Sequence, residues 1–307
     1  MCGADLEAGR MDWLVCIRRA VNYMEENLLT VKGTEEISRY SGVSAMYLQK
    51  GFQIMTGFSL GEYIRNRRLY QSALELCQKD SKVTDIAFKY GYDTSESFSK
   101  AFTRFHNATP SQIKKDSHLI KTFLPLKIHI VIQGGNKMDY TIETIETFKL
   151  IGFERTFNFE NSYEKIPEFW SEIFSKYQSK LFSGKNPENE IEKAVIENRI
   201  GEFGVCIDDV SDGKSFRYLI AGRYFGGEVP QGMKVVELPK AKWAKFNCIG
   251  PLPQSLQTVN TQIWNEWLPG NTEWEISGKY NIEWYSSEKT DSPDYRSEIW
   301  IPVVEKK

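Results

Sequence analysis

The hydrophobic pattern of the 307-residue chain changes once, near residue 115. Residues 12–115 place apolar positions at helical spacing with few prolines, which predicts a run of helices. From about residue 126 apolar and polar residues alternate instead, as in "LKIHIVI", and such segments recur to the end. Two helical stretches, about 164–182 and 254–268, interrupt these predicted strands. The order β, α, β, β occurs twice, so we expect an α+β domain of duplicated βαββ units with an antiparallel sheet.

The helical half contains a repeat of about 50 residues. "EISRYSGVSAMYLQKGFQIMTGFSLGEYI" aligns with "DIAFKYGYDTSESFSKAFTRFHNATPSQI", so that Gly42 matches Gly91 and Phe52 matches Phe102. In each copy a glycine follows a short helix, where it permits a left-handed turn, and a second helix comes next. Helix, glycine turn and helix form the helix-turn-helix unit, whose second helix enters the major groove of DNA.

Two such units joined by the helix "LGEYIRNRRLYQSALELC" resemble the AraC/XylS family of bacterial transcription regulators. The connecting "IRNRRL" and the final "FSKAFTRFHNATPSQIKK" carry the resemblance, with Asn107 at a position where that family usually has glycine. The resemblance implies an all-α domain with two recognition helices that read successive major grooves. One chain then binds two half-sites without dimerising, and RNA polymerase is an expected partner.

The predicted DNA-reading face of each second helix lies opposite its apolar stripe. We expect it to comprise Ala45, Met46, Gln49, Lys50, Ser95, Glu96, Ser99 and Lys100. Glutamine and lysine offer donors to base edges or phosphates, and methionine offers an apolar contact to thymine methyl groups. Two alternatives stay open, namely Met46 as a partly buried core residue and Glu96 as the capping-box partner of Asp93.

Residues 138–307 resemble the GyrI-like small-molecule-binding domain. "MDYTIETIE", "KLIGFE", "EFWSEI", "YNIEWYSS" and "SEIWIPV" carry this resemblance, in that order after the double helix-turn-helix. It implies a cleft between two βαββ halves, lined by aromatic side chains around an acidic one. Such domains bind lipophilic, often cationic molecules, and some relatives hydrolyse reactive ones.

Two of these segments, "YNIEWYSS" and "SEIWIPVV", each place a carboxylate and an aromatic ring on one strand face. A carboxylate among rings is costly unless a positive group arrives, and ring faces attract cations by about 0.5–2 kcal/mol. We therefore expect one site for a cationic, lipophilic effector. Its residues are Glu298, Trp300, Glu283, Tyr285, Trp170 and Tyr224. The alternatives are an ion pair of Glu298 with Arg296 or its exposure at a sheet edge, and structural roles for Trp170 and Tyr224.

The distribution of charge supports two different partners. Residues 1–137 hold 19 Lys and Arg against 14 Asp and Glu, a net charge of +5, whereas residues 138–307 hold 20 against 27, a net charge of −7. The first part suits polyanionic DNA and the second attracts cations. Five scattered cysteines favour free thiols in the cytoplasm, and no apolar run approaches the ~20 residues that span a membrane. We expect no metal, cofactor or catalytic residue.

These observations divide the chain into four segments. They are an N-terminal extension (1–10), an AraC-type DNA-binding domain (11–117), a linker with a strand (118–137) and a GyrI-like effector-binding domain (138–307). The expected function is that of a ligand-responsive transcription activator that binds double-stranded DNA. The alternatives are a small-molecule hydrolase or drug-sequestering protein that carries a DNA-binding module, and a structural nucleoid-binding protein.

Overall fold

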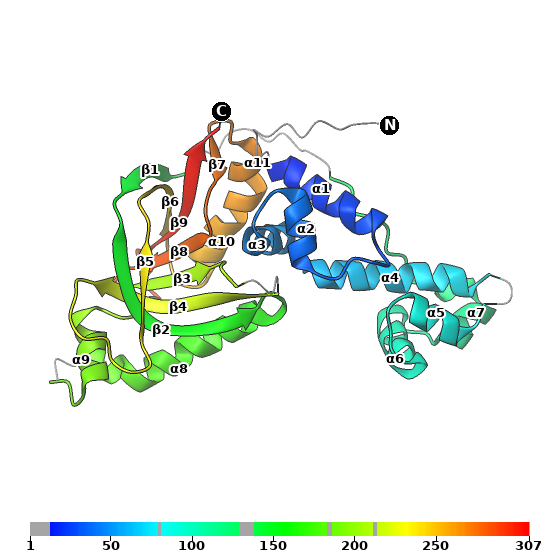
Figure 1. The fold of residues 1–307 in the computed structure, drawn as a ribbon, viewed down its shortest axis with the longest axis horizontal. Helices are drawn as coiled ribbons and strands as arrows, with labels where there is room; N and C mark the ends of the chain where they lie inside the picture. Colours follow the sequence, from blue (N-terminus) through cyan, green and yellow to red (C-terminus); the bar gives the residue numbers. More distant parts are fainter. Residues whose placement is uncertain (1–12, 79–80, 129–137, 183–185, 211–213, 307) are drawn as a thin grey trace.

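A computed structural model describes residues 13–78, 81–128, 138–182, 186–210 and 214–306. A helical part comes first and an α+β part follows, which confirms the predicted fold class (Figure 1). The expected N-terminal extension and most of the expected linker strand lie outside the described residues.

The helical part contains two helix-turn-helix units on either side of a long connecting helix. Its elements are α1 (Trp13–Glu26), α2 (Thr34–Ser41), α3 (Ala45–Thr56), α4 (Leu60–Leu76), α5 (Val83–Lys89), α6 (Ser95–His106), α7 (Pro110–Lys115) and the 3₁₀ helix η1 (Ser117–Leu119). Gly42 follows α2 with φ 77°, the left-handed conformation expected of the turn glycine. The hydroxyls of Ser44 and Thr94 cap α3 and α6.

The connecting helix α4 carries the second unit away from the rest of the molecule, so that α5, α6 and α7 lie at the far end of it (Figure 1). Arg67 fixes this helix to α1, because its guanidinium donates to both carboxylate oxygens of Glu25 at 2.8 and 2.7 Å and to the Phe123 carbonyl at 2.6 Å. The Arg67 side chain is only 3% exposed.

The α+β part is built on one antiparallel sheet. Its strands are β1 (Tyr140–Ile145), β2 (Phe148–Asn158), β3 (Phe203–Ile207), β4 (Ser215–Tyr224), β5 (Lys234–Leu238), β6 (Ala241–Ile249), β7 (Trp274–Ile276), β8 (Tyr280–Tyr285) and β9 (Arg296–Glu305). The strand order is β1-β6-β9-β8-β3-β4-β2-β5, and β7 pairs with β9. Its helices are η2 (Phe159–Asn161), α8 (Ser162–Phe182), α9 (Glu190–Glu197), α10 (Gln254–Gln262), the π-helix η3 (Ile263–Trp267) and α11 (Leu268–Gly270).

The sheet confirms the duplicated βαββ unit. One unit is β2, α8, β3 and β4, the other is β6, α10, β8 and β9, and the two join where β3 pairs with β8. Both α8 and the α10–η3 segment cover the same face of the sheet, which we call the helix face. The opposite face, called here the second face, carries a separate core that includes Val205, Leu219 and Trp243.

The strand register decides which side chains share a face. Glu283 lies opposite Gly204 on β3 and opposite Ile299 on β9, whereas Trp284 lies opposite Glu298. Since directly opposed residues of an antiparallel pair point to the same side, Glu283 lies on the helix face and Glu298 on the second face.

Candidate functional site

The α+β part, called the C-terminal domain from here on, covers the first predicted recognition helix, α3. Met46 and Gln49 of α3 are each 3% exposed, and Lys50 and Ala45 are half-buried. The expectation that this face points outward is wrong for this structure, because η3 and the ends of β3 and β8 pack against it. The assignment of these four residues to DNA stays a prediction, and it requires α3 to leave this position.

Three polar contacts hold α3 against the sheet. The backbone N–H of Met46 donates to the Asp208 carboxylate at 3.0 Å, and the Lys50 ammonium donates to the Asn281 side-chain oxygen at 2.9 Å. The Tyr47 hydroxyl donates to the Tyr280 carbonyl. Asp208 directly follows β3, and Tyr280 and Asn281 begin β8, so all three acceptors lie at one end of the sheet.

Apolar packing adds to these contacts. The Trp264 ring of η3 lies 4.9 Å from the Trp13 ring and 5.9 Å from the Tyr47 ring, measured between centroids. Gly51 of α3 faces the two tryptophans so closely that a Cβ atom would lie 2.2 Å from Trp13 and 2.5 Å from Trp264. The close approach of α3 to the C-terminal domain therefore depends on a residue without a side chain.

Within the part of the chain that the structure describes, the predicted DNA-reading side of the second recognition helix is more exposed. Glu96 and Lys100 of α6 are exposed, and Ser95 and Ser99 are half-buried. The capping-box alternative for Glu96 is wrong, because the N-cap of α6 is Thr94, whose hydroxyl accepts the backbone N–H of Ser97 at 3.1 Å. The DNA-reading role of α6 stays a prediction, and the exposure of Glu96 and Lys100 is compatible with it.

An acidic side chain lies among aromatic rings on the helix face. The Glu283 carboxylate accepts from the Tyr285 hydroxyl at 2.9 Å and from the Tyr218 hydroxyl at 3.4 Å. The Trp170 indole N–H donates to the Tyr218 oxygen at 2.9 Å, and the Trp170 ring meets the Tyr285 ring edge-on at 5.3 Å. We call these four residues the Glu283 cluster. Glu283, Tyr285 and Trp170 were expected at a ligand site.

Burial and the nearby Glu283 carboxylate raise the pKa of Tyr218 and of Tyr285 well above the ordinary value of a phenol. Both hydroxyls therefore stay protonated and donate to Glu283 throughout the physiological range. The sequence did not single out Tyr218, although strand alternation in "RYLIAGRY" places it on the same side as Ile220. Gly204 leaves room for its hydroxyl, because a Cβ there would lie 2.3 Å from that oxygen.

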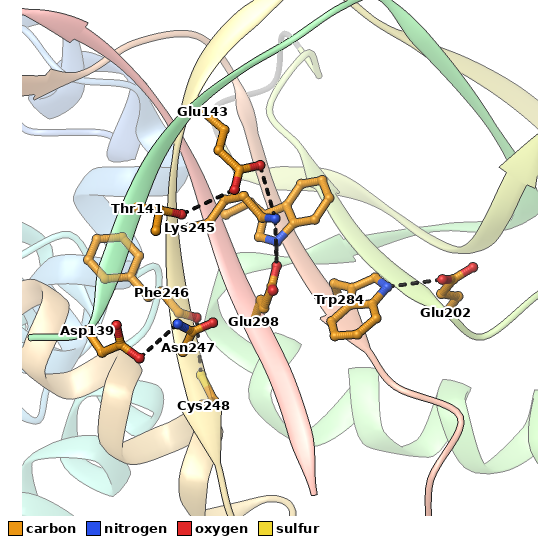
Figure 2. Close-up of polar contacts among 11 residues, drawn as sticks. Asp139, Thr141, Glu143, Glu202, Lys245, Phe246, Asn247, Cys248, Trp284 and Glu298 are labelled. Carbon is orange, nitrogen blue, oxygen red and sulfur yellow. Dashed lines mark hydrogen bonds and ion pairs between the residues drawn. The ribbon is translucent and has the colours of Figure 1, made fainter.

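The second predicted acid–aromatic pair lies on the opposite side of the sheet. The Trp300 indole donates to the Glu298 carboxylate at 2.5 Å, and the Lys245 ammonium lies 3.2 Å from that carboxylate (Figure 2). Lys245 also lies 4.7 Å from the Trp300 ring centroid and 3.3 Å from the Glu143 carboxylate. The expectation of one site with two acids is therefore wrong. Glu298 is paired, though with Lys245 and not with Arg296.

The remaining predicted wall, Tyr224, takes no part in the described contacts of either acid. Its hydroxyl donates to the Gly227 carbonyl at 2.6 Å. A surface hollow of about 570 Å³ lies between the start of α9 and residues 228–232, and its lining includes no residue of the Glu283 cluster. Among the described residues no group of three or more His, Cys, Asp and Glu side chains is placed to hold a metal ion.

Two helix-turn-helix units, joined to a βαββ-duplicated sheet with an acidic aromatic cluster, define a class of DNA-binding regulator that carries a small-molecule-binding domain. Residues 138–304 match the family of the GyrI-like small molecule binding domain, and residues 37–116 match a helix-turn-helix domain family. The chain belongs to the GyrI-like family and carries an AraC-type DNA-binding part. It is a ligand-responsive transcription regulator.

Curated relatives match parts of the chain. It is 38% identical to the transcriptional activator AarP of Providencia stuartii, over 29% of this chain and 66% of AarP. It is 35% identical to the regulatory protein SoxS of Salmonella typhimurium, over 32% of this chain and 92% of SoxS. It is 26% identical to the transcriptional regulator Rob of S. typhimurium, over 53% of this chain and 55% of Rob. No helix among the described residues is long and apolar enough to cross a membrane.

Proposed function

We propose that this protein activates transcription in response to a lipophilic cation bound at the Glu283 cluster. The observation that carries the proposal is the state of the Glu283 carboxylate. It is half-buried beside three aromatic side chains, and among the described residues no ion pair neutralises it. Glu298 is the less favourable candidate, because Lys245 already neutralises it and lies over the Trp300 ring.

The chemistry of the cluster favours binding a cation over catalysis. A cation over the Trp170 and Tyr285 rings gains about 0.5–2 kcal/mol for each ring, in addition to its attraction to the carboxylate. Hydrolysis through a covalent intermediate needs an activated nucleophile. The nearby candidate nucleophiles are the Cys206 thiol and the hydroxyls of Tyr218 and Tyr285. They stay protonated at neutral pH, because burial raises the pKa of Cys206 to about 12 and the pKa of each tyrosine well above its ordinary value.

Isothermal titration calorimetry tests the site with two ions of the same shape and opposite charge. They are the cation tetraphenylphosphonium and the anion tetraphenylborate. We expect the wild type to bind the cation and not the anion. Glu283→Gln keeps the volume and removes the charge, so it should weaken binding about 10- to 100-fold, which corresponds to about 1.5–3 kcal/mol. Glu298→Gln is the matched control on the second face and should bind as the wild type does. Equal affinity of wild type and Glu283→Gln would remove Glu283 from the site.

The proposed regulatory action follows from the two recognition helices. One chain carries two recognition helices, α3 and α6, so we propose that a single copy binds two half-sites in successive major grooves and contacts RNA polymerase directly. The activator assignment is supported by AarP, which is named a transcriptional activator. The two helices differ in exposure, however, because the outward side of α3 is covered by the C-terminal domain and that of α6, among the described residues, is not.

A further inference from the structure

We propose that the C-terminal domain keeps the first recognition helix off DNA by occupying the groups of α3 that DNA would use, and that a cation at the Glu283 cluster releases it. The inference rests on the proposed ligand site for its second half only. We call the observed arrangement the closed form and the arrangement with α3 free the open form.

The acceptors that contact α3 resemble those of a DNA backbone. Asp208 places a carboxylate on the N–H of Met46, in the first turn of α3, where exposed backbone donors and the helix dipole favour an anion. A recognition helix commonly presents this same end to phosphates and base edges. The Asn281 oxygen takes up the ammonium of Lys50 in the same way. A DNA duplex and the end of this sheet therefore compete for the same donors.

The closed form leaves some polar atoms of α3 without hydrogen bonds. The side-chain oxygens of Gln49 and Gln53 are buried and have no hydrogen-bond partner within the described part of the chain. A buried amide oxygen without a partner destabilises the arrangement that buries it. In the open form water or DNA would satisfy Gln49, which lies on the covered face of α3. The closed form is thus held by a few contacts against an opposing cost, as expected of a reversible arrangement.

The contact and the ligand site share one strand. Asn281 and Glu283 are alternate residues of β8 on the helix face, about 7 Å apart along the strand. Lys50 and Glu283 both act on the thiol of Cys206. Burial raises the pKa of Cys206, the Lys50 charge opposes that rise, and the Glu283 charge adds to it. Lys50 and Glu283 therefore both lie close to the same buried thiol. A cation at Glu283 would lie on the same face of β8 as the contact between Lys50 and Asn281 and would repel the Lys50 ammonium, which weakens the closed form.

The second unit provides an internal comparison. In the 50-residue repeat Lys100 of α6 corresponds to Lys50 of α3, and Lys100 is exposed where Lys50 is hydrogen-bonded to the sheet. The closed form thus offers DNA one recognition helix and the open form offers two. Ligand binding would change the number of half-sites that one chain contacts.

The test measures the DNA affinity of the full-length chain by fluorescence anisotropy, on a duplex enriched from a random-sequence pool with the same protein. Asp208→Ala removes the acceptor at the start of α3 without touching a predicted DNA contact. Asp209→Ala is the matched control, because it removes the same charge one residue later, where the carboxylate pairs with Arg217 and not with α3. Each protein is measured with and without tetraphenylphosphonium, and hydrogen exchange follows the amides of α3.

We expect Asp208→Ala without ligand to bind DNA about tenfold more tightly than the wild type, and Asp209→Ala to bind like the wild type. The cation should tighten binding by the wild type by a similar factor, accelerate exchange in α3 and add little to Asp208→Ala. Unchanged affinity of Asp208→Ala, or an equal rise in both variants, overturns the proposal that this contact keeps α3 off DNA. If calorimetry shows that the cation binds while DNA affinity stays unchanged, the release step is wrong. If the cation does not bind at all, the proposed ligand site fails, and Asp208→Ala still decides the first half.

Discussion

The salt dependence of DNA binding distinguishes the two recognition helices, because each lysine–phosphate contact releases counterions. The change is Lys50→Ala in one protein and Lys100→Ala in another, which are equivalent positions of the repeat. In the ligand-free chain Lys100 is exposed, so we expect its loss to weaken binding and to reduce the salt slope by about 1. Lys50 donates to Asn281 in the closed form, so its loss should leave the slope unchanged or steeper.

The magnitude follows from the slope. A change of about 0.9 per phosphate contact alters the loss of affinity between 50 and 200 mM salt by about 3.5-fold, which anisotropy titrations at four salt concentrations resolve. With a bound cation that opens the protein, both substitutions should lower the slope equally. A ligand-free Lys50→Ala protein whose slope falls as much as that of Lys100→Ala would show that α3 contacts DNA without leaving the sheet, and would refute the reasoning.

Two further predictions concern the stability of the helical part. Arg67→Ala should lower the free energy of unfolding by about 3–5 kcal/mol in urea denaturation, because it removes the cation that pairs with Glu25 and a donor to the Phe123 carbonyl. Arg65→Ala, on the exposed side of α4, should change this free energy by less than about 0.5 kcal/mol. Burial lowers the pKa of His106, so folding favours its neutral form and stability should be constant above neutral pH and fall as the pH drops below about 6.5. Urea midpoints at pH 7.5 and 5.5 should differ more in the wild type than in His106→Gln, and an equal pH dependence in both would contradict this account.

Local signals in the sequence predicted much of the fold. The turn glycine Gly42, the capping serine Ser44 and the 50-residue repeat each act within a few residues, so they predicted the helix-turn-helix units correctly. Alternation along each strand also predicted correctly that Glu283 shares a face with Tyr285, and Glu298 with Trp300. These properties follow from the two-residue period of a strand.

The sequence did not predict how neighbouring strands are aligned. Trp284 pairs with Glu298, so the two carboxylates lie on opposite sides of the sheet. A register shifted by one residue would have placed them on the same side, and nothing within either strand selects between the two arrangements. The presence of Lys245 beside Glu298 likewise depends on the pairing of β6 with β9.

The covering of α3 was also not predicted, although one signal points toward it. The outward positions of α3 hold Ala45, Met46 and Gln49, whereas the equivalent positions of α6 hold Ser95, Glu96 and Ser99. The less polar set is the one that the C-terminal domain buries. A sequence shows that a helix has a second apolar side, but it does not name the partner, and here Asp208 is 162 residues away from Met46.

The sequence by itself determined the two DNA-binding units, the duplicated sheet and the residue types that make a cation site feasible, because each of these rests on short-range periodicity and turn chemistry. Only the tertiary structure decided which acid lacks a cation and which recognition helix is accessible. Both depend on contacts between segments far apart in the chain, since Lys245 neutralises Glu298 and the ends of β3 and β8 take up the donors of α3.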